Sequence, residues 1–354
     1  MLKAGKIGAL RAAEVSGISR ALARSEWRRR RLLILCFHGI AMHDEHECFD
    51  MYITAANLRR RLQLVVDTGC AVLPLAEAIR KLQSGDLPPR AVAITFDDGS
   101  RDFYVLGFPI VESFGFPVTL YLTTYYMDFN RPIFDPMCSY LLWKGQELGY
   151  LDWPEVFGQR IALDDAGRRR AQGQIMDYAL EHKLSGAQKD DLLRALAGRL
   201  HCDYEELCRQ RVLHLMNIGE IRDLVTRGLD VQYHTHRHRM HRSRKGMFRE
   251  LDKNRGRIAA VTDAEPRHFC YPGGFYLPEH VGYLREYGIL SAVTCKPGLC
   301  TLETDPLLLP RLVVTRSLSD LEFGAWLSGS AEWIPRRPYR MEERQLAEDP
   351  AELV

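Results

Sequence analysis

The stretch Ala91-Val92-Ala93-Ile94-Thr95-Phe96-Asp97-Asp98-Gly99 decides how the rest of the chain is interpreted. Its first four residues are apolar, which is typical of a fully buried strand, and the strand stops at two adjacent carboxylates and a glycine. Each carboxylate opposes the ionisation of its neighbour, and a bound metal ion would remove that penalty. The same residues also fit a helix start with Asp97 or Asp98 as the N-cap, so this stretch alone leaves both interpretations open.

A second polar cluster, His234-Thr235-His236-Arg237-His238, directly follows a predicted strand at residues 229–233. The His-x-x-x-His spacing lets the chain turn after the first imidazole, so that the second imidazole points back to the same place. Two neutral imidazoles and one carboxylate suit Zn²⁺ or a similar ion, with a position left for water. The alternative is a solvated histidine-rich turn. In an α/β barrel Asp98 and His234 would both lie at carboxyl ends of strands, where such barrels have their active sites.

Composition describes a soluble globular protein. The chain has 354 residues, 46% of them apolar, and a net charge of only +2, which argues against a nucleic-acid-binding or disordered chain. No apolar run approaches the roughly 20 residues of a membrane-spanning helix, and we recognise no secretory signal. The nine cysteines are scattered without a Cys-x-x-Cys pair, which favours reduced thiols and a cytoplasmic location.

Predicted strands alternate with segments of helical spacing along most of the chain. The predicted strands are residues 32–37, 71–73, 91–94, 118–122, 229–233, 268–271, 290–294 and 312–314. The predicted helices are residues 55–68, 75–82, 103–114, 218–227, 246–260, 278–287 and 318–327. This alternation predicts an α/β fold, a distorted (β/α)7-type barrel, over residues 32–330. Between about 125 and 215 strand-like runs are scarce, which predicts a helical insertion.

The two ends of the chain differ from the middle in charge. Residues 1–31 form a basic extension, and residues 331–354 a charged tail. The extension could be an amphipathic helix on an anionic membrane face, which would make the protein membrane-associated. It could equally pack on its own domain. A nucleic-acid-binding arm is disfavoured, because basic residues are not concentrated elsewhere.

Thr95-Phe96-Asp97-Asp98-Gly99 and His234-Thr235-x-x-His238 together resemble the first two motifs of the polysaccharide deacetylases, the nodulation-protein-B-like group of carbohydrate esterase family four. Leu35-Cys36-Phe37-His38-Gly39 resembles the entry strand of a subset of that family. The resemblance spans residues 32–327 apart from the insertion. It implies that Asp98, His234 and His238 bind a divalent metal, with zinc expected, and that Asp97 is the general base.

The resemblance is incomplete at two places. The third family motif usually reads Arg-x-Pro-aromatic-Gly, and the corresponding piece here is Cys270-Tyr271-Pro272-Gly273-Gly274. Its turn can present the Gly273 backbone N–H to a developing oxyanion, and Arg311 is a candidate for orienting Asp97 in place of the missing arginine. The family also carries a late histidine that protonates the leaving amine. No histidine follows His280, and we hypothesise that His38 takes this role.

The resemblance implies a hydrolase of carbon–nitrogen bonds that removes N-acetyl groups from amino sugars of a polysaccharide, an oligosaccharide or a lipid-linked glycan intermediate. The expected partner is therefore an N-acetylated glycan. Two alternatives remain. One is an amidohydrolase of a small acyl-amide on the same scaffold, and the other is a non-catalytic glycan-binding or membrane-binding module with a degenerate site.

Overall fold

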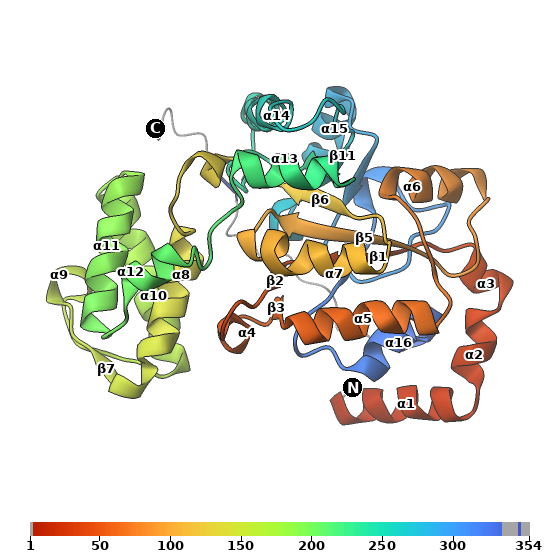
Figure 1. The fold of residues 1–354 in the computed structure, drawn as a ribbon, viewed down its shortest axis with the longest axis horizontal. Coiled ribbons are helices and arrows are strands. Elements are labelled where there is room, and N and C mark those ends of the chain that lie inside the picture. Colours follow the sequence, from red (N-terminus) through yellow and green to blue (C-terminus); the bar gives the residue numbers. More distant parts are fainter. Residues whose placement is uncertain (1–2, 335–345, 348–354) are drawn as a thin grey trace.

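The computed structural model describes residues 3–334 and 346–347 of the chain. A curled parallel sheet lies at its centre, with helices on the outside (Figure 1). The strands of this sheet are β1 (Leu33–Phe37), β4 (Ala71–Val72), β5 (Ala91–Asp98), β6 (Thr119–Leu122), β9 (Asp230–Tyr233), β11 (His268–Cys270), β12 (Ser291–Val293) and β13 (Leu312–Val313). Most of their apolar residues are buried, as expected for a parallel sheet covered by helices; Ala71, Val72 and Val313 are half-buried.

The strand order is β12-β11-β9-β6-β5-β1-β13, with β4 paired to β5 beside this path. The two ends of this order meet, because Leu309 bridges Val293 of β12 while Leu312, three residues later, pairs with Leu35 of β1. The segment joins both edges through hydrogen bonds such as Thr294 N–H to the Leu309 carbonyl, 2.9 Å. The predicted distorted (β/α)7-type barrel is therefore confirmed, and the distortion lies at this seam.

Amphipathic helices cover the barrel. They are α5 (Ala55–Asp67), α6 (Leu75–Ser84), α7 (Phe108–Ser113), α13 (Ile218–Thr226), α14 (Arg244–Ile258), α15 (Pro278–Tyr287) and α16 (Asp320–Ser328). The predicted continuous helix over 103–114 is wrong in detail, since a π-helical turn at Phe103–Gly107 precedes α7. The physical reason is Pro109, which has no N–H to donate to the preceding turn.

The N-terminal extension packs on its own domain. It forms α1 (Lys3–Val15), α2 (Ile18–Ala23) and α3 (Glu26–Arg29), with Leu10 buried in the main core and a 2.9 Å ion pair from Lys6 to Glu322. Arg28 is fully buried and donates to the carbonyls of Leu327, Arg31 and Ala91. Part of the basic run is therefore structural. Among the described residues, no helix has the length and apolar character needed to cross a membrane.

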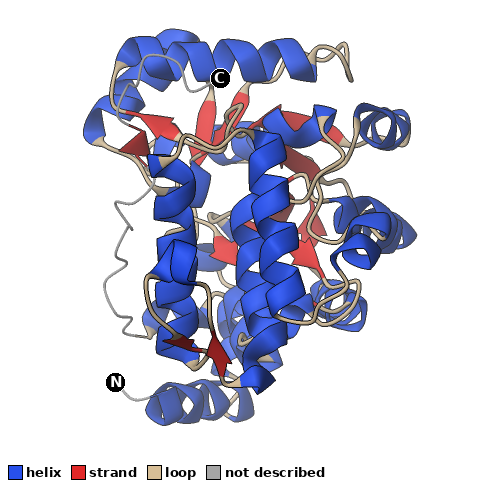
Figure 2. Cartoon of the chain, turned by 90° about the vertical axis from the view of Figure 1, so that its left-hand side faces the viewer, coloured by secondary structure: helices blue, strands red, loops and turns tan. Residues whose placement is uncertain are grey.

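A group of helices lies to one side of the barrel (Figures 1 and 2). It contains α8 (Phe134–Lys144), α9 (Pro154–Phe157), α10 (Asp165–Glu181), α11 (Gly186–Arg199), α12 (Tyr204–Arg209) and the hairpin of β7 (Tyr150–Leu151) with β8 (Ile161–Ala162). These helices bury their own apolar cluster, separate from that of the barrel. The chain returns to the barrel beside the Asp97-Asp98 motif, where Met216 N–H donates to the Gly99 carbonyl at 2.9 Å.

Short elements complete the described fold. They are α4 (Glu45–Cys48), the parallel pair β2 (Gly39–Ile40) and β3 (Tyr52–Ile53), and the parallel pair β10 (Met240–His241) and β14 (Leu346–Ala347). Most of the predicted charged tail, residues 335–345 and 348–354, lies outside the described residues.

Gly39 is required by close packing at the end of β1. A Cβ at this position would collide with the ring of Tyr52. We expect Gly39→Ala to lower the free energy of unfolding by about 1–3 kcal/mol, the usual cost of overpacking. Gly256→Ala is the matched control. It lies within α14 with open space around it and should stabilise by about 0.5–1 kcal/mol. Urea unfolding would measure both, and equal stability of the two variants would contradict the packing argument.

Candidate active site

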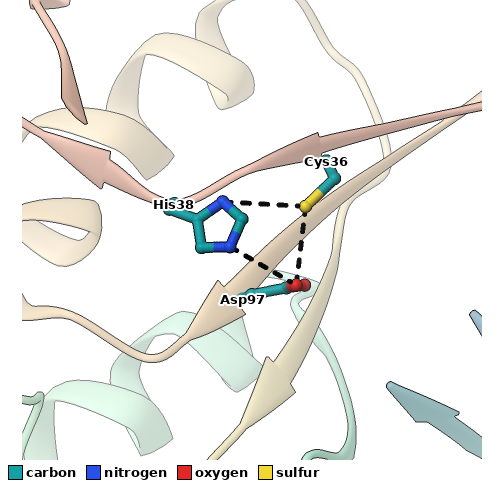
Figure 3. Close-up of side chains that lie close together, drawn as sticks. All are labelled: Cys36, His38 and Asp97. Carbon is teal, nitrogen blue, oxygen red and sulfur yellow. Dashed lines mark hydrogen bonds and ion pairs between the residues drawn. The ribbon is translucent and has the colours of Figure 1, made fainter. Parts of the chain in front are cut away.

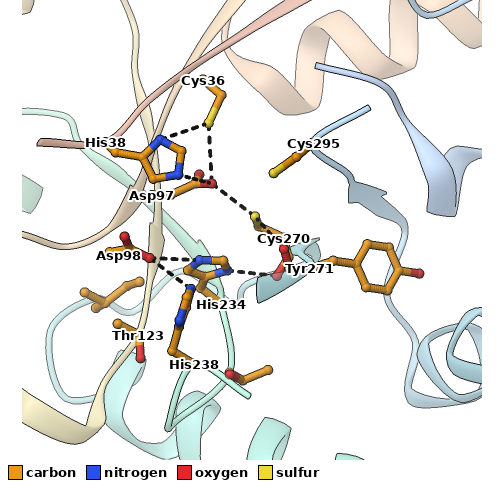
Figure 4. Close-up of polar contacts among 12 residues, drawn as sticks. Cys36, His38, Asp97, Asp98, Thr123, His234, His238, Cys270, Tyr271 and Cys295 are labelled. Atoms are coloured by element: carbon orange, nitrogen blue, oxygen red, sulfur yellow. Dashed lines mark hydrogen bonds and ion pairs between the residues drawn. The ribbon is translucent and has the colours of Figure 1, made fainter. Parts of the chain in front are cut away.

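Polar side chains meet at one rim of the barrel because the parallel strands all end there. Asp97 and Asp98 are the last residues of β5, and His234 directly follows β9. Cys270 ends β11, and His38 directly follows β1. Figure 4 shows these side chains pointing toward one another. Residues far apart in the sequence therefore form one site.

The three predicted metal ligands converge. Asp98 Oδ1 lies 3.1 Å from His234 Nε2 and 3.2 Å from His238 Nε2. All three potential ligand atoms lie within 4.8 Å of one another. Ligand atoms about 2.0–2.1 Å from a tetrahedral Zn²⁺ would be roughly 3.3–3.4 Å apart, so the spacing fits such an ion after small adjustments. A carboxylate and two imidazoles are also a donor set that suits zinc.

The tautomer of His234 also fits metal binding. Its Nδ1 lies 2.8 Å from the carbonyl oxygen of Cys270, which can only accept a hydrogen bond, so Nδ1 carries the proton. Nε2 is then left with a free lone pair that faces Asp98. Such an outer hydrogen bond is the usual way in which proteins fix the orientation of a histidine ligand.

Asn254 is a site residue that the sequence analysis missed. It is fully buried on α14, and its Oδ1 accepts the His234 backbone N–H at 3.1 Å. Its Nδ2 donates to the Leu122 carbonyl and to Thr124 Oγ1. The side chain therefore joins β6, β9 and α14 behind the first histidine. One polar residue in a helical pattern offers no sequence signal for this role.

The backbone of the site is strained. Asp98, Thr235 and His238 have φ values of 73°, 60° and 55°, in the left-handed region that residues other than glycine rarely occupy. Each such residue costs about 1–3 kcal/mol and persists only where the surroundings hold it. Here Thr235 Oγ1 accepts the Arg239 N–H at 3.0 Å and bridges the turn. Gly99, at φ 91°, has no room for a Cβ, which would lie 2.5 Å from Leu122 Cδ1.

The charges at this cluster suit a cation. Burial by itself raises the pKa of Asp98, but His238 and His234 outweigh it and hold that pKa well below its usual value. Burial lowers the pKa of His238, and Asp98 more than compensates, so the net shift is upward. The carboxylate thus attracts positive charge to the point where the two imidazoles meet. A divalent ion would replace a proton at this point.

Asp97 forms a buried ion pair with Arg311, and a carboxylate oxygen of Asp97 also lies within 4.8 Å of a His234 ring nitrogen. The guanidinium donates from Nη1 to Asp97 Oδ1 at 2.8 Å and from Nη2 to Oδ2 at 2.7 Å. Arg311 also donates to the Thr294 carbonyl and lies 3.1 Å from Cys270 Sγ. It therefore reaches the side chain of Cys270, which stands where the family motif has its arginine. The sequence hypothesis that Arg311 contacts and orients Asp97 agrees with this geometry.

His38 lies beside Asp97, with Nε2 3.8 Å from Asp97 Oδ2 (Figure 3). Cys36 Sγ lies 3.7 Å from His38 Nδ1 and 3.4 Å from the same carboxylate oxygen. Burial lowers the pKa of His38, and Asp97 opposes this shift only in part. The lowered pKa favours the neutral form of the ring, which lies beside the predicted base. The side chain of His38 keeps 13% exposure, which leaves it accessible from the rim.

Cys270 and Gly273 lie at the end of β11 and in the turn that follows it. Gly273, the predicted oxyanion donor, has φ 58° in a 3₁₀ turn, Pro272–Gly274, that directly follows Tyr271. The role of its backbone N–H as the oxyanion donor stays a prediction. Burial raises the pKa of the Cys270 thiol well above its usual value, which makes this thiol a poor nucleophile.

The Asp97–Arg311 pair predicts a pH-dependent effect on stability. Burial raises the pKa of Asp97, but Arg311 outweighs it and lowers that pKa well below its usual value. The pair therefore stabilises the fold above the ordinary carboxyl pKa, and its contribution is lost as the pH falls below it. Arg311→Gln leaves a buried unpaired carboxylate and should cost about 3–5 kcal/mol at neutral pH.

In the Arg311→Gln variant burial acts alone on Asp97, so its pKa should rise and protonation should favour the folded state. The deficit relative to the wild type should then shrink as the pH falls from neutral toward 4. Urea midpoints over that range would measure the difference. A deficit that stays constant with pH would contradict the ion-pair argument.

The metal cluster predicts specific losses of zinc. His238→Gln should weaken zinc binding by more than the roughly 10–100-fold that loss of an outer hydrogen-bond partner costs. His236→Gln is the matched control, since the His236 ring bonds to Thr124 Oγ1 at 2.9 Å rather than to the cluster. Zinc content after dialysis against a weak chelator would be compared for both. Equal zinc content would contradict the assignment of ligands.

Residues 213–292 match the family model described as polysaccharide deacetylase. The poly-beta-1,6-N-acetyl-D-glucosamine N-deacetylase of Escherichia coli (strain K12) is 30% identical over 98 residues, which are 27% of this chain and 14% of the relative. Both His234 and His238 lie inside the range that matches the family model, whereas Asp97, Asp98 and Arg311 lie outside it.

Solved structures share the fold over most of the chain. IcaB from Ammonifex degensii has a TM-score of 0.55 at 15% identity, covering 84% of this chain and 97% of that one. The Streptococcus pyogenes deacetylase PplD, in complex with acetate, has a TM-score of 0.54 at 16% identity, covering 82% of this chain and 96% of that one. The family model over residues 213–292, the curated relative and the shared fold agree with the motif pair, and together they indicate the polysaccharide deacetylase family.

Proposed function

We propose that this protein removes N-acetyl groups from amino sugars of an oligo- or polysaccharide, with a zinc ion bound by Asp98, His234 and His238. One observation carries the proposal. Two adjacent carboxylates at the end of β5 have different partners, since Asp98 faces two imidazoles while Asp97 is held by Arg311. Asp98 is thereby available to bind a metal ion, and Asp97 is available to accept a proton.

Asp97 acts as the general base. When bound, the ion supplies Lewis acidity toward the acetamide carbonyl and increases the acidity of water. Asp97 remains ionised because Arg311 lowers its pKa, and it accepts the proton of the attacking water. The two bonds from Arg311 also hold the carboxylate in one orientation, which reduces the entropy that must be lost during reaction.

His38 transfers the proton to the leaving amine. Its Nε2 lies 3.8 Å from Asp97 Oδ2, beyond hydrogen-bond range, so a proton accepted by the carboxylate passes to the imidazole once the two groups approach or through a bridging water, and from there to the amine nitrogen. The C–N bond breaks as the nitrogen gains this proton, and the products are acetate and a free amino sugar. The Gly273 backbone N–H is the proposed donor to the oxyanion that forms before the bond breaks.

Acetate release from oligomers of N-acetylglucosamine by the zinc-loaded protein tests this proposal. Asp97→Asn should lower kcat by about 10²–10⁴-fold, the usual contribution of a general base. His38→Gln should lower kcat with little change in KM, because it acts on the leaving group. Both variants should keep their zinc, since neither residue is a proposed ligand.

Asp97→Asn also removes the counter-charge of Arg311, so its folding must be checked by circular dichroism and zinc content before kinetics are compared. A folded, zinc-loaded wild type that releases no acetate from any N-acetylated glycan would overturn the proposal. Unchanged turnover in zinc-loaded His38→Gln would remove His38 from the mechanism and leave Asp97 in place.

A further inference from the structure

A cavity of 490 Å³ lies between the barrel and the helices beside it. Three segments form its walls, namely the chain from β6 to α8, the junction of α10 with α11, and the loop that carries the metal-ligand histidines. Arg237 and Arg239 belong to the last segment and flank His238. The cavity therefore adjoins the loop that carries His238, while Asp98, His234 and His238 themselves are not among its lining residues.

The wall nearest the histidines is aromatic. Tyr125 packs against Tyr126 and Phe129, with ring centroids 5.1 and 5.4 Å away. The Tyr125 backbone N–H donates to the His236 carbonyl at 2.8 Å, which ties this wall to the histidine loop. Flat aromatic faces suit the apolar faces of sugar rings. The cavity is therefore placed to hold the part of a glycan next to the reacting residue.

The cavity is strongly basic. Its lining contains five cationic side chains and a single carboxylate, those of Arg131, Lys183, Lys189, Arg237, Arg239 and Asp190. The carboxylate is already used, because Asp190 accepts the Tyr204 hydroxyl at 2.5 Å and pairs with Arg194 at 3.4 Å. Of the cations, Arg237 pairs with Glu250 at 3.1 Å. The other four have no ion-pair partner among the residues that the structure describes.

Lys189 and Arg131 are half-buried, whereas Lys183 and Arg239 are exposed. Burial lowers the pKa of Lys189, and the nearby charge of Arg239 lowers it further. Arg131 lies over the first residue of α11, where a Cβ on Gly186 would come 3.0 Å from Arg131 Nη1. The first N–H groups of that helix have no acceptor within the helix and add to the positive potential.

We infer that this cavity binds a phosphate group of the substrate, beside the amino sugar that is deacetylated. Mutual repulsion of four unpaired cations is relieved when an anion enters. A phosphate monoester carries about 1.5–2 negative charges at neutral pH and several acceptor oxygens, which balances such a group better than a single carboxylate does. The inference rests on the proposed function for the position of the sugar, and the substrate class is then a phosphorylated amino sugar.

Direct binding tests the inference without catalysis. N-acetylglucosamine 1-phosphate should bind the zinc-loaded full chain more tightly than N-acetylglucosamine, and this preference should weaken as ionic strength rises. Lys189→Gln and Arg239→Gln should each reduce affinity for the phosphorylated sugar about tenfold. Arg59→Gln, an exposed arginine on α5, is the matched control and should bind like the wild type. Equal binding of both sugars, or unchanged binding in both cavity variants, would overturn the inference.

Two further arms identify the source of the phosphate and separate this inference from the proposed function. If the phosphate is lipid-borne, the chain should bind phosphatidylcholine vesicles that contain phosphatidic acid, and the Lys189→Gln/Arg239→Gln double variant should not. If it is soluble, only the sugar phosphate should show the difference between wild type and variant. Acetate release from neutral oligomers tests the proposed function alone. If the protein releases no acetate but still binds the sugar phosphate, the proposed function is wrong and the assignment of the cavity is not affected. If the sugar phosphate binds the double variant as tightly as it binds the wild type, its phosphate group contacts the zinc and not the cavity. That result would overturn the inference.

Discussion

The buried ion pair between Asp97 and Arg311 is the interaction on which the site depends. It joins the end of β5 to the segment that closes the barrel, and both partners are almost fully buried. Two hydrogen bonds from Arg311 fix the orientation of the Asp97 carboxylate beside the point where Asp98 meets the histidines. Because charge buried without a partner is costly, the pair also favours closure of the seam. The same interaction therefore contributes to the fold and gives the two neighbouring aspartates different surroundings.

The metal cluster is held by its surroundings against local backbone preference. Asp98, Thr235 and His238 all adopt left-handed conformations that side chains disfavour. Hydrogen bonds to Asn254 and to the Cys270 carbonyl fix His234 between these strained residues. Strain of this kind is expected where geometry serves binding rather than stability. The strained residues lie at the end of β5 and in the loop after β9, and contacts with β11 and α14 hold this loop in place.

The helices beside the barrel add a wall that the barrel alone does not have. Their own apolar cluster lets them fold against one another, while the contact of Met216 with Gly99 ties their return to the catalytic rim. The cavity between them and the loop after β9 is lined by aromatic and cationic side chains, including Arg237 and Arg239 on either side of His238. In such folds the barrel supplies the chemistry, and the loops and insertions select the substrate.

The strand–helix alternation, the two metal motifs and the family resemblance could all be predicted from the sequence, because periodicity and motif spacing are local properties. Arg311 could be named only as a candidate, since nothing local in Leu309-Pro310-Arg311 shows that its guanidinium reaches Asp97. Asn254, the interrupted helix before α7 and the basic cavity were not predicted. The first and last arise from contacts between residues far apart in the chain, which only the tertiary structure decides. Closure of the barrel is also decided by the tertiary structure. The seam at Leu309 forms only when both edges of the sheet curl far enough to share one segment.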